Sequence, residues 1–443
     1  MRTARDHGSD VTAPGGTGPR RAEAWESWVW SGRDRLRVPF ATDVLPPATP
    51  VPAHDPAGAV RRALAAPPGT ERLSSLARGA ARVAIAVPDG SRKAPTPDVL
   101  PPVLAELEAG GVSPATTTVV VGCGMHRDPS RDEIVGLVGG AAGRVETIAA
   151  QGRVTPHADL GTTATGCPVC IARRVAEADL VVAVGVVEPH LYAGYSGGVK
   201  AVAVGCAGEE TIVWTHSPAF IARPGVELLR LAGNPFQACL REIARRTSLR
   251  FAVNVVLDQD GGLVEVAAGG PAAVQERLVK HNAETWLRRT DRTYDLVVAG
   301  VPAPKDASLY QATRAATYLG LADRPAVRDG GLIVVCAGLA EGAGGGPAEE
   351  HFADLLREHG PGDLLRRGLD TPLGPGGQRA WVVARVLSRF RLGMVGGRPP
   401  AGLGIEHFED LEEAFRAAAP RDGRDPEVLA VADAMTTVVR GYE

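Results

Sequence analysis

Several features are missing from this 443-residue chain, and each absence excludes a class of protein. No apolar run approaches the roughly 18 residues of a membrane-spanning helix, and the first residues form no apolar signal segment. Basic residues are not in excess, since the net charge is −3, and a nucleic-acid interface needs a basic surface. Six cysteines are too few for a disulfide scaffold in so long a chain. We therefore expect a cytoplasmic protein that binds neither a membrane nor nucleic acid.

Lysine is also scarce. Of 48 basic residues only four are lysines, namely Lys93, Lys200, Lys280 and Lys305. A guanidinium cannot replace an amine that must react, so a lysine kept in such an arginine-rich chain is a candidate for amine chemistry. The count strengthens that expectation without assigning a role.

Short β-branched runs alternate with stretches of helical apolar spacing, which is typical of a parallel α/β sheet. The expected strands are 83–87, 117–122, 180–185 and 251–257, and the expected helices are 98–109, 131–138 and 236–246. After a junction at 288–292 the pattern restarts with strands at 294–299 and 332–336 and helices from 309 and near 378–390. The sequence thus predicts an α/β fold of two α/β domains with mainly parallel sheets and an active-site cleft between them.

This pattern divides the chain into four segments. We expect residues 1–35 to be a disordered tail and 36–288 to be an N-terminal α/β domain that binds a cofactor and carries catalysis. Residues 292–415 are expected to form a smaller C-terminal α/β domain, and 416–443 a C-terminal helix that packs back on the first domain.

Two polar patches directly follow expected strands. Asp89, Ser91 and Arg92 lie in the first patch, and such residues at the carboxyl end of a strand suit an anionic group, although a polar turn would look the same. His126 lies in the second patch, where it is either an acid/base group or a structural histidine.

A third patch runs from Glu188 to His216 and is the densest. It contains His190, Lys200 and His216 around a glycine loop, and imidazole suits nickel, copper or zinc. A fourth patch lies in the second domain, where Tyr310, Gln311 and Arg314 share a helix face that could hold a carboxylate or be a solvated helix start.

Hydrolase chemistry is the alternative. Ser196 lies in a G-x-S-x-G sequence, but a nucleophile elbow needs its serine directly after a strand, and here the apolar run ends earlier, at Val187. A zinc held by His126, His190 and His216 lacks the usual H-E-x-x-H helix. The Cys167–Cys170 spacing has no second pair, so two buried thiols are expected there.

Taken together and in order, these patches resemble the nickel-pincer lactate racemase family. The resemblance extends from about Val38 to Leu387 and includes Asp89-Gly90-Ser91-Arg92, Gly124-Met125-His126-Arg127, Pro189-His190, Ala193-Gly194-Tyr195-Ser196-Gly197-Gly198-Val199-Lys200, Gly208-Glu209-Glu210-Thr211-Ile212, His216, Leu309-Tyr310-Gln311 and Trp381. A single motif would be weak evidence, whereas the ordered set is specific.

The resemblance implies a racemase or epimerase that inverts C2 of a 2-hydroxy acid, lactate-like or larger, by hydride transfer to a cofactor. That cofactor is nickel held by pyridinium-3,5-bisthiocarboxylic acid mononucleotide. The implied roles are covalent attachment at Lys200, nickel ligation by His216, acid/base catalysis by His126 and His190, cofactor binding by Asp89, Ser91, Arg92, Gly197 and Gly198, and substrate binding by Arg92, Tyr310, Gln311, Arg314 and Trp381. The implied partners are a small-molecule 2-hydroxy acid and the enzymes that make the cofactor, while the oligomeric state is not predicted.

Chemistry agrees with this resemblance. Inverting a hydroxy acid by hydride removal needs an acceptor that no side chain provides, and one base on each face of the carbon. The chain departs from the family at Arg314, where lysine is usual, and at Thr215, where asparagine is usual, so the substrate stays open. A hydrolase and a cofactor-binding protein without turnover stay as alternatives.

Overall fold

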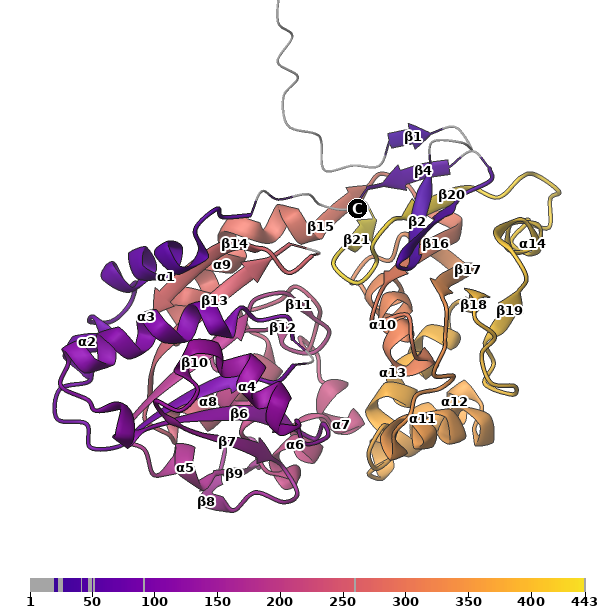
Figure 1. Cartoon of the computed structure of the whole chain (residues 1–443). Helices are drawn as coiled ribbons and strands as arrows, with labels where there is room; N and C mark the ends of the chain where they lie inside the picture. Colours follow the sequence, from indigo (N-terminus) through magenta and orange to yellow (C-terminus); the bar gives the residue numbers. More distant parts are fainter. Residues whose placement is uncertain are drawn as a thin grey trace, which may run out of the picture.

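Two α/β units lie side by side in the computed structural model, which describes residues 20–22, 27–40, 42–46, 50, 52–90, 92–258 and 260–441 (Figure 1). Each unit is built around one mainly parallel sheet, which confirms the expected fold class. Within these ranges no helix has the length and apolar character that crossing a membrane would require.

The first unit contains a six-stranded sheet. In sheet order its strands are β14 (Leu263–Gly269), β13 (Leu249–Leu257), β10 (Leu180–Val186), β5 (Val83–Pro88), β6 (Thr117–Gly124) and β7 (Glu146–Gln151). Only the edge pair β13–β14 is antiparallel; the other four pairs are parallel.

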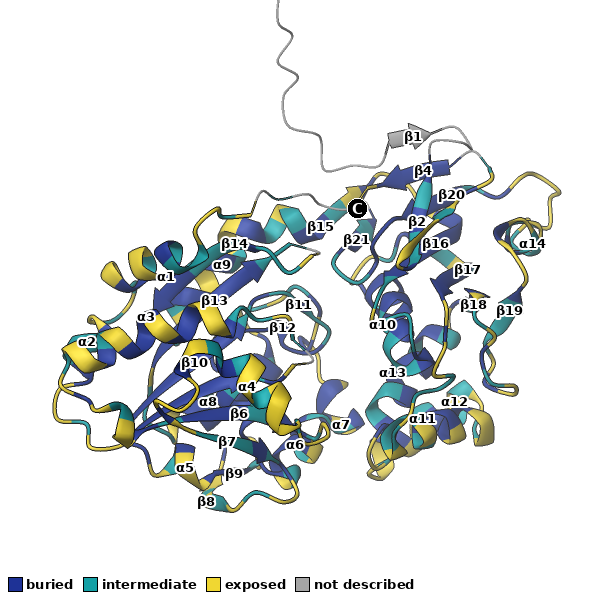
Figure 2. Cartoon of the chain, in the orientation of Figure 1, coloured by how far each residue is buried: buried dark blue, intermediate teal, exposed yellow. Residues whose placement is uncertain are grey.

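Helices cover both faces of this sheet, as a parallel sheet requires. Along β5, Ile85 lies in a hydrophobic core with α1 (Pro56–Ala65) and α3 (Thr96–Ala109), whereas Ala84 lies in the opposite core with α8 (Pro235–Arg245). Side chains of a strand alternate between faces, so the apolar run of β5 fills both cores. The central strands β10 and β13 are likewise mostly buried and dark blue in Figure 2.

The second unit contains a nine-stranded sheet. Its order is β1 (Arg20–Ala22), β4 (Thr42–Leu45), β20 (Val428–Val431), β16 (Tyr294–Pro302), β17 (Val327–Ala337), β18 (Arg391–Gly396) and β19 (Glu406–Phe408), with β2 (Trp28–Gly32) pairing with β16 and with β3 (Asp34–Arg37). The pairs β1–β4 and β2–β3 are antiparallel and the others are parallel.

Both ends of the chain differ from expectation. The expected tail contains β2 and the first half of β3, and β4 pairs with β20 in the second unit rather than belonging to the first. The expected helix over 416–443 is wrong, because α14 (Leu411–Ala417) ends there and β20 and β21 (Val438–Gly441) follow. Periodicity cannot assign a four-residue apolar run such as Val428–Val431 to helix or strand. In the structure this run is β20, which lies between β4 and β16 and pairs with both. The rest of the expected tail lies outside the described residues, apart from the β1 backbone.

The remaining helices and strands complete the two units. They are α2 (Leu73–Leu76), α4 (Arg131–Val138), β8 (His157–Thr162), β9 (Pro168–Ala172), α5 (Arg173–Ala176), β11 (Pro189–His190), β12 (Gly194–Tyr195), α6 (Glu209–Thr215), α7 (Pro218–Ile221), α9 (Pro271–Trp286), β15 (Leu287–Thr290), α10 (Leu309–Gly320), α11 (Pro347–Glu358), α12 (Pro361–Asp370) and α13 (Gly377–Leu387). Short helical turns occupy Pro114–Thr116, Gly139–Ala141 and Ala201–Gly205.

The two units touch through α10, α12 and α13. The hydroxyl of Tyr318 in α10 donates to the carbonyl of Pro189 in β11 at 3.1 Å, and its ring packs against Leu228 and Val438. Trp381 of α13 joins a hydrophobic core of the first unit, and α12 packs on α7. The C-terminal part of α10 therefore contacts the segment that follows β10.

Candidate active site

Three of the four polar patches follow neighbouring strands of the first sheet. Asp89 and Arg92 follow β5, His126 follows β6, and His190 follows β10, and these strands are adjacent in the order β10-β5-β6. The carboxyl ends of parallel strands share one edge of a sheet, so the structure brings these residues to a common edge. Ser91 lies outside the described residues.

The ring of His126 is oriented by a carboxylate. Its Nδ1 lies 2.7 Å from Oδ2 of Asp89, and the Asp89 side chain is largely buried while that of His126 is largely exposed. An ionised carboxylate accepts a hydrogen bond, so Nδ1 carries a proton toward Asp89 and Nε2 is left as the available nitrogen.

His190 has the opposite arrangement. Its Nδ1 accepts hydrogen bonds from the backbone N–H groups of Tyr192 at 3.3 Å and Ala193 at 3.1 Å, which leaves the proton of the neutral ring on Nε2. Burial lowers the pKa of His190 well below its usual value, and the charges of Lys200 and Arg92 lower it further. The ring is therefore neutral at pH 7.

A glycine loop positions Lys200. Gly197 and Gly198 have φ values of +80° and +57°, and a Cβ at Gly197 would lie 2.5 Å from the Val187 side chain, so the loop needs glycine there. The side chain of Asn254 holds the loop from behind by accepting from the Gly198 N–H at 2.5 Å. Burial lowers the pKa of Lys200 to about 7, and the charge of Arg92 adds to this effect. A large share of the amine is therefore unprotonated near neutral pH.

His216 follows α6 and presents one free nitrogen. Its Nδ1 lies 3.0 Å from the Ile212 carbonyl and donates to it, so Nε2 keeps its lone pair. Burial lowers the pKa of His216 to about 4, and the charge of Lys200 contributes. Tyr192 and Phe236 flank the ring, with centroids 5.8 and 5.3 Å away. A neutral imidazole with a free nitrogen and a donated N–H is the form that ligates a metal.

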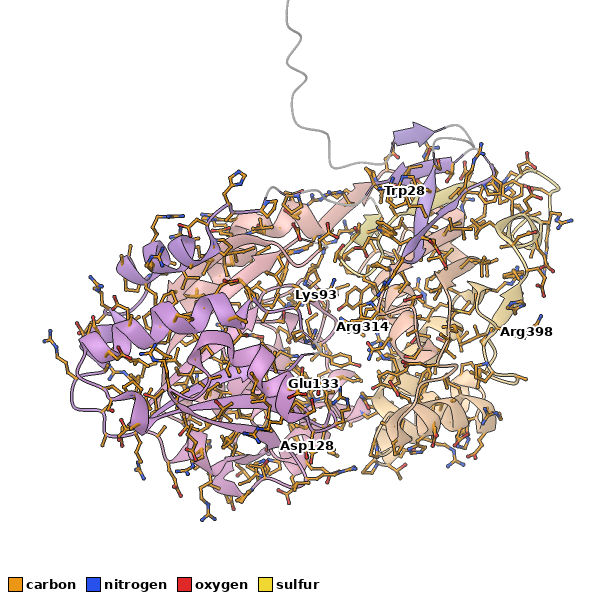
Figure 3. All side chains as sticks on the ribbon, in the orientation of Figure 1. Trp28, Lys93, Asp128, Glu133, Arg314 and Arg398 are labelled. Carbon is orange, nitrogen blue, oxygen red and sulfur yellow. The ribbon has the colours of Figure 1, made fainter. Side chains whose placement is uncertain are left out.

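The second unit contributes Arg314 from α10 (Figure 3). Its Nη2 donates to the hydroxyl of Tyr318 at 3.0 Å, and that hydroxyl donates to the Pro189 carbonyl. Tyr310 and Gln311 occupy the first turn of the same helix, and the Tyr310 hydroxyl accepts from Gln378 at 3.3 Å. The expected substrate-binding helix is therefore connected to the segment that carries His190.

Trp381, which was expected to bind the substrate, lies in a hydrophobic core. It is 4% exposed, and its Nε1 donates to the Leu365 carbonyl at 3.1 Å. Because its polar edge is already bonded and its ring lies in the hydrophobic core between the units, packing is the role that its contacts show directly.

Three further residues to which the sequence analysis assigned no role lie in the site, namely Glu188, Lys305 and Tyr318. Glu188 binds Arg92 at 2.6 Å; burial acts to raise its pKa, but the charges of Arg92, Arg314, Lys200 and Lys305 outweigh burial and hold it below the usual value. Lys305 follows β16, and burial lowers its pKa to about 8, with the charges of Arg314 and Arg92 lowering it further. Both had a usable signal, because Glu188 directly follows an expected strand and Lys305 is one of four lysines.

The contacts weaken the hydrolase alternative. The Ser196 hydroxyl donates to the Val186 carbonyl at 2.7 Å and accepts from the Glu188 N–H at 3.1 Å, so backbone groups already occupy it. Among the described residues no group of three or more His, Cys, Asp or Glu side chains is arranged to hold a metal, so His126, His190 and His216 do not form a zinc site. Cys167 and Cys170 are free thiols, and Cys170 Sγ donates to Glu210 at 2.9 Å.

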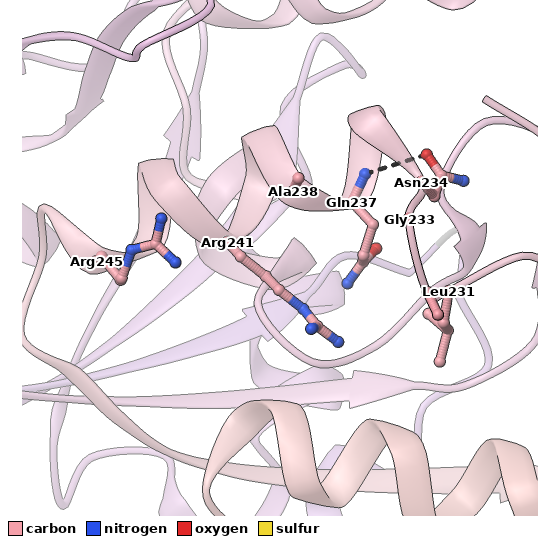
Figure 4. A pocket seen from close by; sticks show the side chains of 8 residues that line it. Leu231, Gly233, Asn234, Gln237, Ala238, Arg241 and Arg245 are labelled. Atoms are coloured by element: carbon pink, nitrogen blue, oxygen red, sulfur yellow. Dashed lines mark hydrogen bonds between the residues drawn. The ribbon is translucent and has the colours of Figure 1, made fainter. Parts of the chain in front are cut away.

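A cavity of about 210 Å³ opens elsewhere, at the start of α8 (Figure 4). It is lined by Leu231, Ala232, Gly233, Asn234, Gln237, Ala238, Arg241 and Arg245. Asn234 caps the helix there, with Oδ1 accepting from the Gln237 N–H at 3.3 Å. None of the candidate site residues lines this cavity, so the site is defined by its converging side chains.

Known proteins match this chain along most of its length. Residues 35–228 match the lactate racemase N-terminal domain, and residues 291–439 match the lactate racemase C-terminal domain. Lactate racemases of Thermoanaerobacterium thermosaccharolyticum and Lactiplantibacillus plantarum are each 28% identical, over 391 and 400 residues; each comparison covers 86% of this chain and 90% of the relative.

Solved structures show the same similarity. The lactate racemase apoprotein from Thermoanaerobacterium thermosaccharolyticum superimposes with a TM-score of 0.81 at 25% identity, covering 93% of this chain and 99% of that one. A Thermotoga maritima protein superimposes with a TM-score of 0.64 at 16% identity, covering 88% of this chain and 100% of that one, which shows the fold alone.

Proposed function

The chain belongs to the lactate racemase family, and from this premise we propose that it inverts C2 of a 2-hydroxy acid, lactate-like or larger. One observation carries the proposal: the charge of Lys200 lowers the pKa of both His190 and His216, and both imidazole rings pack against Tyr192 and Phe236, so the amine and both imidazoles lie near one another. An amine, a ligating imidazole and acid/base imidazoles are the groups that this reaction requires.

The residues present fit the nickel-pincer cofactor that the family implies. With a pKa of about 7, a large share of the Lys200 amine is unprotonated near pH 7, as covalent attachment to a thiocarboxylic acid requires. His216 is neutral and has a free Nε2, as nickel ligation requires. When bound, the cofactor supplies the hydride acceptor that side chains lack. The proposed holders are Lys200, His216, Asp89, Arg92 and the Gly197–Gly198 turn.

The proton work falls to His126 and His190. Nε2 of His126, with Asp89 behind the ring, takes the hydroxyl proton of one enantiomer as the planar 2-keto acid forms. To return a proton to the oxygen on the other face, His190 takes up a proton from solvent to form the imidazolium and then gives one proton back from Nε2, because loss of a proton from the neutral ring would leave an imidazolate. Positive side chains, Arg92 and Arg314, bind the substrate carboxylate, with Tyr310 and Gln311 on the same helix as Arg314.

Intact mass and chiral analysis test this proposal. Protein coexpressed with the cofactor-making enzymes should contain nickel and a modified Lys200, whereas Lys200→Arg should contain neither. His126→Ala and His190→Ala should lose inversion of lactate or another 2-hydroxy acid from a screened panel, and His216→Ala should mainly lose nickel. His54→Ala, at an exposed histidine before α1, is the matched control and should behave as the wild type.

Two results would contradict the proposal. An unmodified Lys200 under these conditions would show that the cofactor is not attached to this residue. A modified Lys200 without inversion of any hydroxy acid tested would instead identify a cofactor-binding protein without turnover.

A further inference from the structure

The loop that follows β16 holds Lys305 in a fixed place. The Ala303 N–H donates to the Gly32 carbonyl at 3.0 Å, and the Asp306 carbonyl accepts from the Leu339 N–H at 2.9 Å. The loop is therefore bonded to β2 on one side and to the segment after β17 on the other, so the backbone of Lys305 is anchored at both ends.

Lys305 is half-buried in the loop that joins β16 to α10, the helix that carries Arg314. The charges of Arg314 and Arg92 act on it unfavourably, and those of Glu188 and Asp89 act favourably. Groups from both units therefore surround it: Arg314 comes from α10, and the other three follow strands of the first sheet. In the part of the chain that the structure describes, Lys305 forms no ion pair with a carboxylate.

The acidic groups nearby already have partners. Glu188 binds Arg92 at 2.6 Å, and Asp89 binds His126 at 2.7 Å. Attachment of the cofactor would convert Lys200 to a neutral amide, which leaves Arg314 and Lys305 as the two cations without a carboxylate partner among the described residues. A partly desolvated cation without a counter-ion is unfavourable, so two such cations favour the binding of two anionic groups.

The carboxylate next to the reacting carbon of the substrate accounts for only one of the two anionic groups. We propose that Lys305 binds a second oxyanion, distal to the reacting carbon, so that the site accepts a 2-hydroxy acid with two carboxylates. The phosphate of the cofactor nucleotide has the same oxyanion chemistry and is the other possible source. This inference rests on the proposed function for its substrate class but not for the anion-binding role of Lys305.

Binding and kinetics of Lys305→Met test the inference. Methionine keeps the length of the side chain and removes the charge, and Lys305→Arg restores a cation. Lys280→Met is the matched control, because Lys280 is exposed on α9. In the holoenzyme, Lys305→Met should lower kcat/KM for malate about tenfold relative to lactate, as expected for the loss of one charged contact.

A second readout separates this inference from the proposed function. Succinate has no reacting hydroxyl, and its dissociation constant, measured by calorimetry, should rise about tenfold in Lys305→Met while that of propionate stays the same. This result would support the inference even if the wild type inverted no hydroxy acid. Cofactor occupancy after coexpression with the cofactor-making enzymes, measured by intact mass, tests the other source.

Each outcome is decisive. A lower kcat/KM for malate and weaker binding of succinate, with lactate and propionate unaffected, identify a distal substrate carboxylate as the anion. Loss of cofactor occupancy, with malate and lactate affected equally, identifies the cofactor phosphate. Unchanged malate kinetics, succinate binding and occupancy in Lys305→Met would overturn the inference, and so would equal effects in Lys280→Met. Recovery in Lys305→Arg shows that misfolding is not the cause.

Discussion

Replacing Tyr318 by phenylalanine tests whether the contact between the units supports catalysis. Tyr318 is 3% exposed, and its hydroxyl accepts from Arg314 at 3.0 Å and donates to Pro189 at 3.1 Å. Pro189 directly precedes His190, so this hydroxyl connects Arg314, which we propose binds the substrate, to the segment of the other unit that carries the proposed acid/base residue His190. Phenylalanine keeps the ring and its packing on Leu228 and removes only the hydroxyl.

The magnitude follows from the two hydrogen bonds. Removing the hydroxyl leaves a buried carbonyl acceptor and one guanidinium N–H without their partner, and leaving a buried polar group unsatisfied costs about 1–3 kcal/mol. We take about 2 kcal/mol as the free energy by which the substitution destabilises the contact between the two units. If inversion requires that arrangement, kcat/KM should fall about thirtyfold, since about 1.4 kcal/mol corresponds to a factor of ten.

Chiral chromatography of the substrate measures kcat and KM, and thermal melting measures stability. Tyr294→Phe is the matched control: Tyr294 is 1% exposed, its hydroxyl donates to Asp43 at 2.9 Å, and it begins β16 at the end away from the site. That variant should lose stability and keep its activity. Equal kcat/KM in Tyr318→Phe and wild type, or equal loss in both variants, would refute the reasoning.

Two further predictions concern Lys200 and Ser196. The pKa of Lys200 is lower in the folded protein, about 7, than in the unfolded chain, so between about pH 7 and 10 the unfolded state binds the extra proton and stability rises with pH. Urea unfolding of the cofactor-free protein should therefore show a slope up to about 1.4 kcal/mol per pH unit steeper than that of Lys200→Met, and parallel slopes would contradict the prediction. Ser196→Ala should lower the free energy of unfolding by about 1–3 kcal/mol, because it leaves the Glu188 N–H without its acceptor. The wild type should not be labelled by a serine-directed fluorophosphonate, and labelling at Ser196 would restore the hydrolase alternative.

Local pattern was sufficient for much of the first unit. The helix expected over 131–138 is α4, whose start is fixed by Ser130 accepting from the Glu133 N–H at 3.2 Å. The expected strands at 83–87 and 180–185 are confirmed as β5 and β10. These elements were predictable because caps and apolar periodicity are properties of neighbouring residues.

Long-range pairing was not predictable in the same way. Nothing local in β4 shows that it pairs with β20, which lies almost at the other end of the chain. The run at Val428–Val431 is apolar on both faces, and it is a strand only because it lies between β4 and β16. Trp381 likewise has a sequence context that suggests a substrate wall, whereas its indole N–H is already bonded to Leu365.

The difference between local pattern and long-range contact also explains which site residues could be predicted from the sequence. Asp89, His126 and His190 each follow an expected strand, so topology alone placed them at one edge of the first sheet. Lys305 and Tyr318 act across the junction of the units, and their relation to Glu188 and Pro189 depends on how the two sheets are docked. Burial is the largest cause of the lowered pKa of Lys200, and the charge of Arg314, which belongs to the second unit, lowers this pKa further. The reactivity of the amine is therefore a property of the assembled units, and substitutions at the junction, such as Tyr318→Phe, should alter chemistry at residues that they do not touch.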